Sequence, residues 1–234
     1  MGCPLKGGGG LYSRLRIGAV LLAAGEGKRL HGMPKAAIEM QGVPLIRRAL
    51  IAISGAGVDE VVVVLGYQAD LIESLVQDFP VTLVRNADYG AGQMSSVRLG
   101  LESFAGAFDA VLVVLVDQPL LNSQDLTALI GAFKKRLSGS IVVPRVHGQR
   151  GNPVIFDWQA RNDILANGKA LDCRKYIDTH PELVCVFETD NDHFVVDLDT
   201  PEDIEKLQKR LGLELKLPSA LRPVELEKCH HGQH

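Results

Sequence analysis

Residues 17–35 of the chain read IGAVLLAAGEGKRLHGMPK, and the interpretation of the whole sequence starts from this stretch. It opens with a continuous apolar run, Ile17–Ala23, which is typical of a strand that is buried on both faces of a sheet. A glycine-containing loop follows directly and carries two cations, Arg29 and Lys35. Because ligands of open α/β sheets bind beyond the carboxyl ends of the strands, this loop is predicted to lie at the binding edge.

Outward from this loop, strand and helix patterns alternate along the chain. Strand-like apolar runs occupy residues 17–23, 61–65, 81–84, 111–116, 141–143, 154–156, 184–187 and 194–196. Helix-like patterns occupy residues 44–54, 69–77, 95–104 and 123–137, the last with Ser123 as its cap, and a final helix that starts at Thr200. Repeated β-α-β units predict an α/β, Rossmann-like three-layer fold with a mostly parallel central sheet, and the pair of strands within 141–156 predicts a small antiparallel insertion.

The length of 234 residues suits one large domain. We expect a flexible N-terminal segment at 1–15, which contains four consecutive glycines. The domain itself is expected over 16–212, and a C-terminal tail that ends in Cys and His residues over 213–234.

Charge and cysteine content exclude several classes of partner. The net charge is −3, so no excess of positive charge is available to neutralise a nucleic-acid backbone, and we expect no nucleic-acid partner. The apolar run at 17–24 is too short to span a bilayer and no signal peptide is visible, so we expect no membrane partner. The four cysteines form no CxxC pair, which fits a reducing, cytoplasmic setting.

Three interpretations of the loop at 24–30 compete. A dinucleotide fingerprint needs a third glycine three residues after Gly27, where Leu30 stands. A P-loop needs Ser or Thr after Gly27-Lys28, where Arg29 stands. The simplest alternative is a plain glycine turn, whereas a polyphosphate site would use the small residues to bring backbone N–H groups close to an anion.

Acidic side chains follow two further strands of the predicted sheet. Asp117 closes the strand at 111–116, and Asp197 and Asp199 lie two residues apart, so that in an extended chain they would share a face. We expect Asp197 to join Asp117 as a metal ligand, with Asp199 as second choice because it adjoins the last helix. One or two carboxylates plus substrate phosphates typically hold Mg²⁺, which is therefore the predicted cofactor.

Two polar segments complete the candidate site. Residues 90–96, GAGQMSS, open a helix with free backbone N–H groups and two hydroxyls, which can bind an anion or nucleotide or can serve as a plain capped helix entry. Residues 148–156, GQRGNPVIF, include the loop between the two strands of the predicted insertion.

The run LAAGEGKRLHGMPK resembles the N-terminal signature of the MobA-like NTP transferases, a motif of the form LAAGxGxRxGxxK. The segments DQP at 117–119 and VDLDTPED at 196–203 align with the two Mg²⁺-binding aspartate positions of this superfamily. GQMSSVRLGL at 92–101 and GQRGNPVIF are similar to motifs of its molybdenum cofactor cytidylyltransferase, or MocA-like, branch. The resemblance, with these five motifs in order, covers about residues 17–210.

The resemblance implies a role for individual residues. Arg29, Lys35 and Asp117 would be catalytic, and Asp117, Asp197 and Asp199 would hold the metal. The nucleotide would bind through Leu22, Ala23, Ala24, Gly25, Glu26, Gly27, Arg29, Lys35, Gly92, Ser95 and Asp117. The acceptor would bind through Gln93, Ser96, Gln118, Arg150, Gly151, Asn152 and Pro153.

The implied reaction moves CMP from CTP onto the phosphate of molybdopterin that carries molybdenum, with pyrophosphate as the second product. Ala23-Ala24 goes with the cytidylyl branch, whereas the guanylyl branch tends to LAGG, so GTP is the second nucleotide to test. The apoenzyme of a molybdenum hydroxylase, which uses the product, is a further implied partner. The segment GKALDCR at 168–174 departs from the branch's usual Gly-Asp-x-Gly-Ala-Arg, so the acceptor is less closely specified than the nucleotide chemistry.

Three other functions fit parts of the pattern. A cytidylyl- or guanylyltransferase acting on a sugar or isoprenoid phosphate would share the loop and the aspartates. A non-catalytic chaperone that delivers the cofactor to a hydroxylase would not require Lys35, Asp117 and Asp197 together. An NAD-dependent oxidoreductase would need the third glycine that Leu30 replaces.

Overall fold

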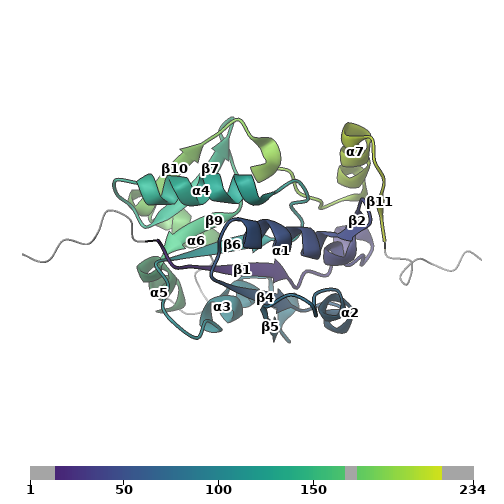
Figure 1. Ribbon diagram of the computed structural model, residues 1–234, viewed down its shortest axis with the longest axis horizontal. Helices are drawn as coiled ribbons and strands as arrows, with labels where there is room; N and C mark the ends of the chain where they lie inside the picture. Colours follow the sequence, from purple (N-terminus) through teal and green to yellow (C-terminus); the bar gives the residue numbers. More distant parts are fainter. Residues whose placement is uncertain (1–13, 167–172, 218–234) are drawn as a thin grey trace, which may run out of the picture.

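The computed structural model describes residues 14–166 and 173–217. Its main sheet has the strand order β10-β7-β9-β6-β1-β4-β5, with β8 paired to β7 (Figure 1). The strands are β1 (Ile17–Ala23), β4 (Glu60–Leu65), β5 (Thr82–Arg85), β6 (Ala110–Leu115), β7 (Ile141–Val146), β8 (Gln149–Arg150), β9 (Val154–Asp157) and β10 (Val184–Glu188). The predicted α/β class with a mostly parallel sheet is confirmed.

The central part of the sheet is parallel, since β1 lies between β4 and β6 and runs in the same direction as both. The predicted antiparallel insertion is present as β9, which pairs antiparallel with β6 on one side and with β7 on the other. Successive residues of β1 point to opposite faces and are all buried, as expected for a strand covered on both sides.

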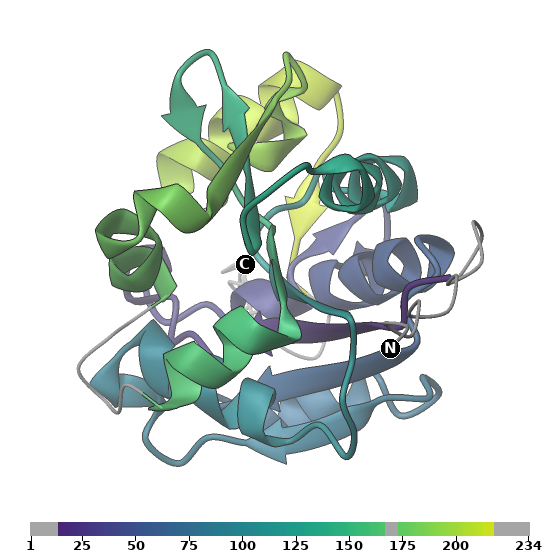
Figure 2. The same cartoon turned by 90° about the vertical axis from the view of Figure 1, so that its left-hand side faces the viewer.

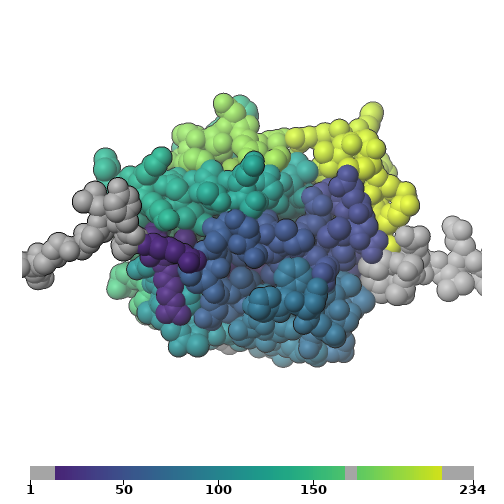
Figure 3. Space-filling model, in the orientation of Figure 1, coloured from purple at the N-terminus to yellow at the C-terminus, as the bar shows by residue number. Residues whose placement is uncertain are grey.

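Helices cover both faces of the sheet and give the three layers. On one face α1 (Leu45–Gly55) and α4 (Ser123–Lys135) lie side by side, and Figure 3 shows them together on the outer surface. On the other face lie α3 (Gln93–Glu102), α5 (Trp158–Ala166) and α6 (Cys173–Thr179), which Figure 2 shows from the side. Each face has its own hydrophobic cluster, to which β1 contributes alternate residues, Ala19 and Leu21 on one side and Val20 and Leu22 on the other. None of the helices within the described ranges is long and apolar enough to cross a membrane.

A small second sheet was not anticipated from the sequence. It has the order β11-β2-β3 and is formed by β2 (Glu39–Met40), β3 (Val43–Pro44) and β11 (Leu215–Lys216). The last strand comes from the segment that the sequence assigns to the C-terminal tail, and it is reached through the helix α7 (Pro201–Leu211). The remainder of that tail, and the predicted N-terminal segment up to residue 13, lie outside the described residues.

Several local predictions need correction. Residues 194–196 are not a strand: a 3-10 turn, η6 (Asp192–Phe194), occupies this place, and the N–H groups of Val195 and Val196 both donate to the carbonyl of Asp192. Asn122, not Ser123, caps α4, because the Asn122 side chain accepts from the N–H groups of Gln124 and Asp125. The helices α5 and α6 were missed because their apolar faces are short. The cap of α7 is as predicted, with Thr200 and Asp203 bonded to each other's backbone.

Candidate nucleotide-binding and active site

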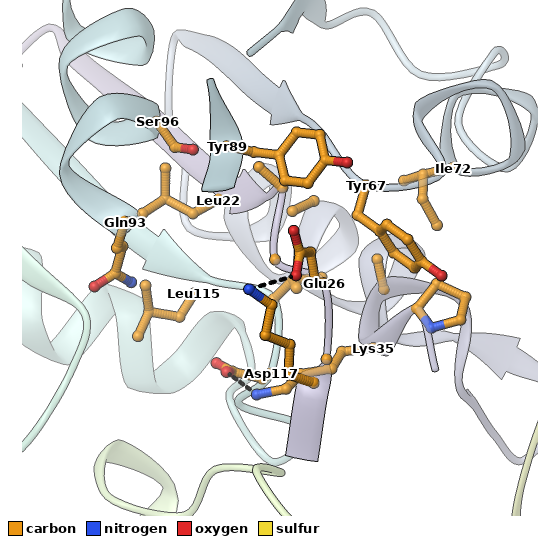
Figure 4. A pocket seen from close by; sticks show the side chains of 18 of the residues that line it. Leu22, Glu26, Lys35, Tyr67, Ile72, Tyr89, Gln93, Ser96, Leu115 and Asp117 are labelled. Carbon is orange, nitrogen blue, oxygen red and sulfur yellow. Dashed lines mark hydrogen bonds and ion pairs between the residues drawn. The ribbon is translucent and has the colours of Figure 1, made fainter. Parts of the chain in front are cut away.

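A pocket of about 410 Å³ opens at the carboxyl ends of β1, β4 and β6, which is the edge where an open α/β sheet is expected to bind ligands. Thirteen of the residues singled out in the sequence line it. They are Leu22, Ala23, Ala24, Gly25, Glu26, Gly27, Arg29, Lys35, Gly92, Gln93, Ser96, Asp117 and Asp199. Segments separated by more than 160 residues therefore meet in one cavity, as Figure 4 shows for part of the set.

The glycine loop after β1 is shaped by Gly27. This residue has φ +59, in the left-handed region, and a Cβ atom built on it would lie 2.2 Å from the carbonyl oxygen of Met33. Its own carbonyl accepts from the N–H groups of Leu30 at 2.8 Å and Gly32 at 3.1 Å, which closes the loop into the short 3-10 helix η1 (Lys28–Leu30). By contrast, a Cβ on Gly25 would meet nothing within 4 Å, so the backbone at Gly25 faces open space. A side chain is excluded at Gly27, and the backbone at Gly25 is accessible to a ligand.

Lys35 joins the two acidic segments. Its ammonium lies 2.9 Å from Asp117 Oδ2 and 2.5 Å from Asp199 Oδ1 (the Asp117 contact is drawn in Figure 4). Arg29 Nη1 adds a third contact, 3.1 Å from Asp199 Oδ2. Burial acts to lower the pKa of Lys35, but the two carboxylates outweigh it, so the pKa of Lys35 is raised and the side chain is held as a cation.

Of the two aspartates at 197 and 199, the structure places Asp199, the second choice from the sequence, beside Lys35. Asp197 does not line the pocket, whereas Asp199 does. The Asp199 side chain does not cap α7, because the cap residue is Thr200, whose hydroxyl accepts from the N–H of Asp203. Burial, with the nearby charges of Asp199 and Asp117, raises the pKa of Asp197, so the three carboxylates are close enough to influence one another. An extended segment would place both aspartates on one face, but only Asp199 contacts Lys35.

The carboxylates fit a divalent cation only together with a ligand. Within residues 14–166 and 173–217, no three His, Cys, Asp or Glu side chains form a ready metal cage. However, Asp117 Oδ1 is buried and has no hydrogen-bond partner among these residues. A buried carboxylate oxygen without a partner is costly, and a cation bound with a phosphate ligand would satisfy it.

Of the residues predicted to bind the acceptor, Gln93 and Ser96 line the pocket and the other five do not. Gln118, Arg150, Gly151, Asn152 and Pro153 all lie outside its lining. The buried Gln118 donates through Nε2 to the backbone carbonyls of Asn152 at 3.2 Å and Phe194 at 3.0 Å. Gly151 packs so tightly on Phe194 that an added Cβ would lie 2.5 Å from its carbonyl oxygen. These contacts hold the GNP loop against the segment that leads to Asp199.

Arg150 points elsewhere, since its guanidinium pairs with Asp178 of α6 at 2.8 Å. Ser95 also lies outside the pocket lining, and its hydroxyl donates to the carbonyls of Asp88 and Gly92. Ser96, one residue later, lines the pocket. The sequence had assigned Ser95 to the nucleotide and Ser96 to the acceptor, and of the two only Ser96 is in contact with the cavity.

Two tyrosines of the pocket were missed in the sequence. Tyr67 follows β4 and Tyr89 begins the 3-10 turn η3 (Tyr89–Ala91), and their rings meet edge to face with centroids 6.4 Å apart. Gly66 permits this approach, because a Cβ there would lie 2.7 Å from Tyr89 Cβ and 2.8 Å from Ala24 Cβ. The sequence offers one signal for each tyrosine. Tyr67 stands just beyond the end of a predicted strand, and Tyr89 stands beside the GAGQ segment.

Comparison with known proteins identifies the family of the chain. Residues 19–183 match the MobA-like NTP transferase domain. The chain is 32% identical over 198 residues to nicotine blue oxidoreductase of Paenarthrobacter nicotinovorans. The aligned region covers 82% of this chain and 96% of that protein.

Solved structures share the fold. A nucleotidyl transferase from Methanothermobacter thermautotroptrophicus superposes with a TM-score of 0.71 at 20% identity, covering 83% of this chain and 97% of that one. The Rv0371C protein of Mycobacterium tuberculosis H37Rv, in complex with manganese, superposes with a TM-score of 0.65 at 20% identity, covering 83% of this chain and 98% of that one. The match of residues 19–183 spans most of the sheet and the glycine loop, and the chain belongs to the MobA-like NTP transferase family.

Proposed function

We propose that the protein transfers CMP from CTP to the phosphate group of molybdopterin carrying molybdenum and releases pyrophosphate. The observation that carries the proposal is the meeting of Lys35, Asp117 and Asp199 beside the glycine loop. A cation flanked by carboxylates next to the open backbone at Gly25 suits a triphosphate and the charge that develops on it.

In this reaction an oxygen of the acceptor phosphate forms a bond to the α-phosphorus of CTP. The bond from the α-phosphorus to the oxygen that bridges to the β-phosphate breaks, and pyrophosphate leaves with the electron pair. The attacking phosphate oxygen is already ionised near neutral pH, so no general base is needed. The task of the protein is to position the two ligands and stabilise negative charge. Lys35 and Arg29 supply fixed positive charge, and the backbone around Gly25 is open to the phosphates.

Mg²⁺ is the proposed cofactor, with Asp117 and Asp199 as its protein ligands and Asp197 as a nearby supporting charge. The unpartnered Oδ1 of Asp117 supports this assignment. The manganese complex of the related fold supports a divalent ion in general. When bound, Mg²⁺ would neutralise charge on the phosphates.

The choice of substrates follows the sequence motifs. Ala23 and Ala24 line the pocket, and the LAAG pattern that contains them favours CTP, with GTP as the second nucleotide. The segments at 92–101 and 148–156 favour molybdopterin and, downstream, the apoenzyme of a molybdenum hydroxylase as partner. We place the reaction in the cytoplasm.

The direct experiment incubates the protein with Mg²⁺, labelled CTP or GTP, and molybdenum cofactor, and measures pyrophosphate and the labelled dinucleotide. Sugar and isoprenoid phosphates are the parallel acceptors. Labelled product with molybdenum cofactor and CTP supports the proposal, and product with only a sugar or isoprenoid phosphate refutes molybdopterin as the acceptor.

Asp117→Asn is expected to abolish transfer while the thermal unfolding midpoint stays near that of wild type. If transfer activity is absent from the wild type but cofactor is still delivered to a hydroxylase, the chaperone function replaces it.

A redox function is the second candidate, and one observation favours it: a relative that is 32% identical over nearly its whole length is named an oxidoreductase. The loop lacks the fingerprint for binding a nicotinamide dinucleotide, because Leu30 stands at the position of the third glycine and is buried. Titration with NADH separates the two candidates, since saturable tight binding of NADH together with no binding of CTP would favour the redox enzyme.

A further inference from the structure

Asn86 is a buried polar residue beside the pocket that the proposed reaction does not use. It follows β5, is 7% exposed, and its backbone N–H donates to the carbonyl of Leu65 at 2.8 Å. Its side-chain Oδ1 accepts from the N–H of Asp88 at 2.9 Å. Its Nδ2 donates to the hydroxyl oxygens of Ser95 at 2.8 Å and Ser96 at 2.9 Å.

The orientation of this amide is fixed by chemistry. A backbone N–H can only donate, so the side-chain atom that faces the N–H of Asp88 has to be the oxygen. The amide nitrogen then faces the two serines, and both of its hydrogens are used. Each serine hydroxyl is therefore an acceptor toward Asn86 and has to direct its own hydrogen elsewhere.

The two serines differ in where that hydrogen can go. Ser95 has protein acceptors, the carbonyls of Gly92 at 2.9 Å and Asp88 at 3.1 Å. The hydroxyl hydrogen of Ser96 has no acceptor among residues 14–166 and 173–217. Ser96 is 4% exposed and lines the pocket, so its free donor is available to a ligand there.

This donor lies in the part of the pocket suited to a ring rather than to phosphates. In Figure 4 Ser96 and Tyr89 lie away from the ion pair of Lys35 and Asp117, with the apolar side chain of Leu22 close by. A triphosphate at the cationic end would extend its nucleoside toward this apolar and aromatic end. A planar base is well matched to an aromatic wall with a few polar groups.

We propose that Asn86 is a positioning residue that makes Ser96 a hydrogen-bond donor to the nucleobase. The site thereby selects a base that presents an acceptor, a carbonyl oxygen or an unprotonated ring nitrogen, at this place; cytosine carries both in O2 and N3. This inference rests on the proposed function in so far as the pocket binds a nucleoside triphosphate.

The test inverts the polarity of Ser96 and measures the part of the affinity that belongs to the base. In Asn86→Asp the new carboxylate accepts from Ser96, whose hydrogen then turns away from the pocket. The dissociation constants of CTP and of inorganic triphosphate, each with Mg²⁺, are measured by calorimetry. The added charge acts on both ligands, so the readout is the ratio of the two constants. We expect Asn86→Asp and Ser96→Ala each to reduce the preference for CTP over triphosphate by about tenfold, the value of one hydrogen bond of about 1.4 kcal/mol.

A double-mutant cycle tests whether Asn86 affects binding of the base through Ser96. If Asn86 acts through Ser96, adding Asn86→Asp to Ser96→Ala changes the ratio no further. The exposed Asn162→Asp on α5 makes the same charge change outside the pocket lining and leaves the ratio at the wild-type value. An unchanged ratio in Asn86→Asp, or fully additive effects in the double variant, overturns the proposal.

The outcome is separable from that of the proposed function. A wild-type protein that binds CTP in the Ser96-dependent manner but transfers no CMP would refute the proposed reaction and leave this inference standing. A wild-type protein that transfers CMP but binds CTP no more tightly than triphosphate would refute the inference alone.

Discussion

At the scale of single residues, Gly27 and Lys35 determine the shape and the charge arrangement of the pocket. Gly27 lets the loop turn back under Met33, and Lys35 gathers Asp117 and Asp199. The need for a glycine at the turn and for a cation after it was predictable from the motif. The choice of Asp199 over Asp197 was not, because it depends on the direction in which the segment leaves Leu198, whose N–H donates to the carbonyl of Asp117 at 2.9 Å. That contact joins segments 81 residues apart, so no local sequence pattern could predict it.

Replacing Gly27 by alanine tests the loop. Gly27→Ala has to adopt φ +59 and also places a Cβ against the carbonyl of Met33. Gly42→Ala is the matched control, because Gly42 has φ +76 but open space around its Cβ. The left-handed backbone alone costs about 1–2 kcal/mol, so we expect that loss of unfolding free energy for Gly42→Ala and a clearly larger loss for Gly27→Ala. Urea denaturation measures both; equal losses would show that the contact with Met33 imposes no constraint.

At the scale of secondary-structure elements, α7 fixes the start of the segment that carries Asp199. Its capping box was predictable, since Thr200, Pro201 and Asp203 stand in the order typical of a helix start. Thr200→Ala removes the side-chain acceptor for the N–H of Asp203 and is expected to lower the unfolding free energy by about 1 kcal/mol. Thr127→Ala, inside α4 and exposed, is the control and is expected to leave the unfolding free energy unchanged or to raise it slightly, since alanine favours the helix more than threonine does. A Thr200→Ala protein as stable as wild type would show that the cap is not needed.

The ion pair between Arg210 of α7 and Asp192 of η6 is expected to make the stability of the fold depend on pH. Hydrogen bonds from Arg210 hold the pKa of Asp192 below its ordinary value. A carboxyl group with a lowered folded-state pKa stabilises the fold above its unfolded pKa of about 3.9, and this contribution is lost as the pH falls through the folded-state pKa. Because the pair is largely exposed, Arg210→Gln is expected to cost about 0.2–1 kcal/mol at pH 7, and the difference from wild type should vanish at the most acidic pH. Urea denaturation from pH 7 downward measures the difference; a constant difference would contradict the assignment.

At the scale of the whole molecule, the site exists because the parallel part of the sheet brings distant loops to one edge. The alternation of strands and helices was sufficient to predict this edge, the loop after β1 and Asp117 at the end of β6. The small sheet could not be predicted from the sequence, because two-residue strands such as β2 and β11 have no periodicity and pair only after the chain has folded. The position of Gln118 was not predictable for a similar reason: its neighbour Asp117 lines the pocket, but Gln118 is buried and donates to the carbonyls of Asn152 and Phe194. Sequence motifs identified the segments that meet, and tertiary contacts decided which side chains face the ligand.

The central claim is that Lys35, held between Asp117 and Asp199, binds the triphosphate together with Mg²⁺. The direct measurement is the dissociation constant of CTP with saturating Mg²⁺, by calorimetry, for Lys35→Met and for Lys28→Met. Lys28 is the matched control, because it also lines the pocket but is 77% exposed and pairs only with Glu26 among the described residues. We predict that Lys35→Met weakens CTP binding by about 10- to 100-fold, the value of one charge-assisted contact, and that Lys28→Met changes it by less than about threefold. CTP binding by Lys35→Met at wild-type strength, or an equal loss in both variants, would contradict the account.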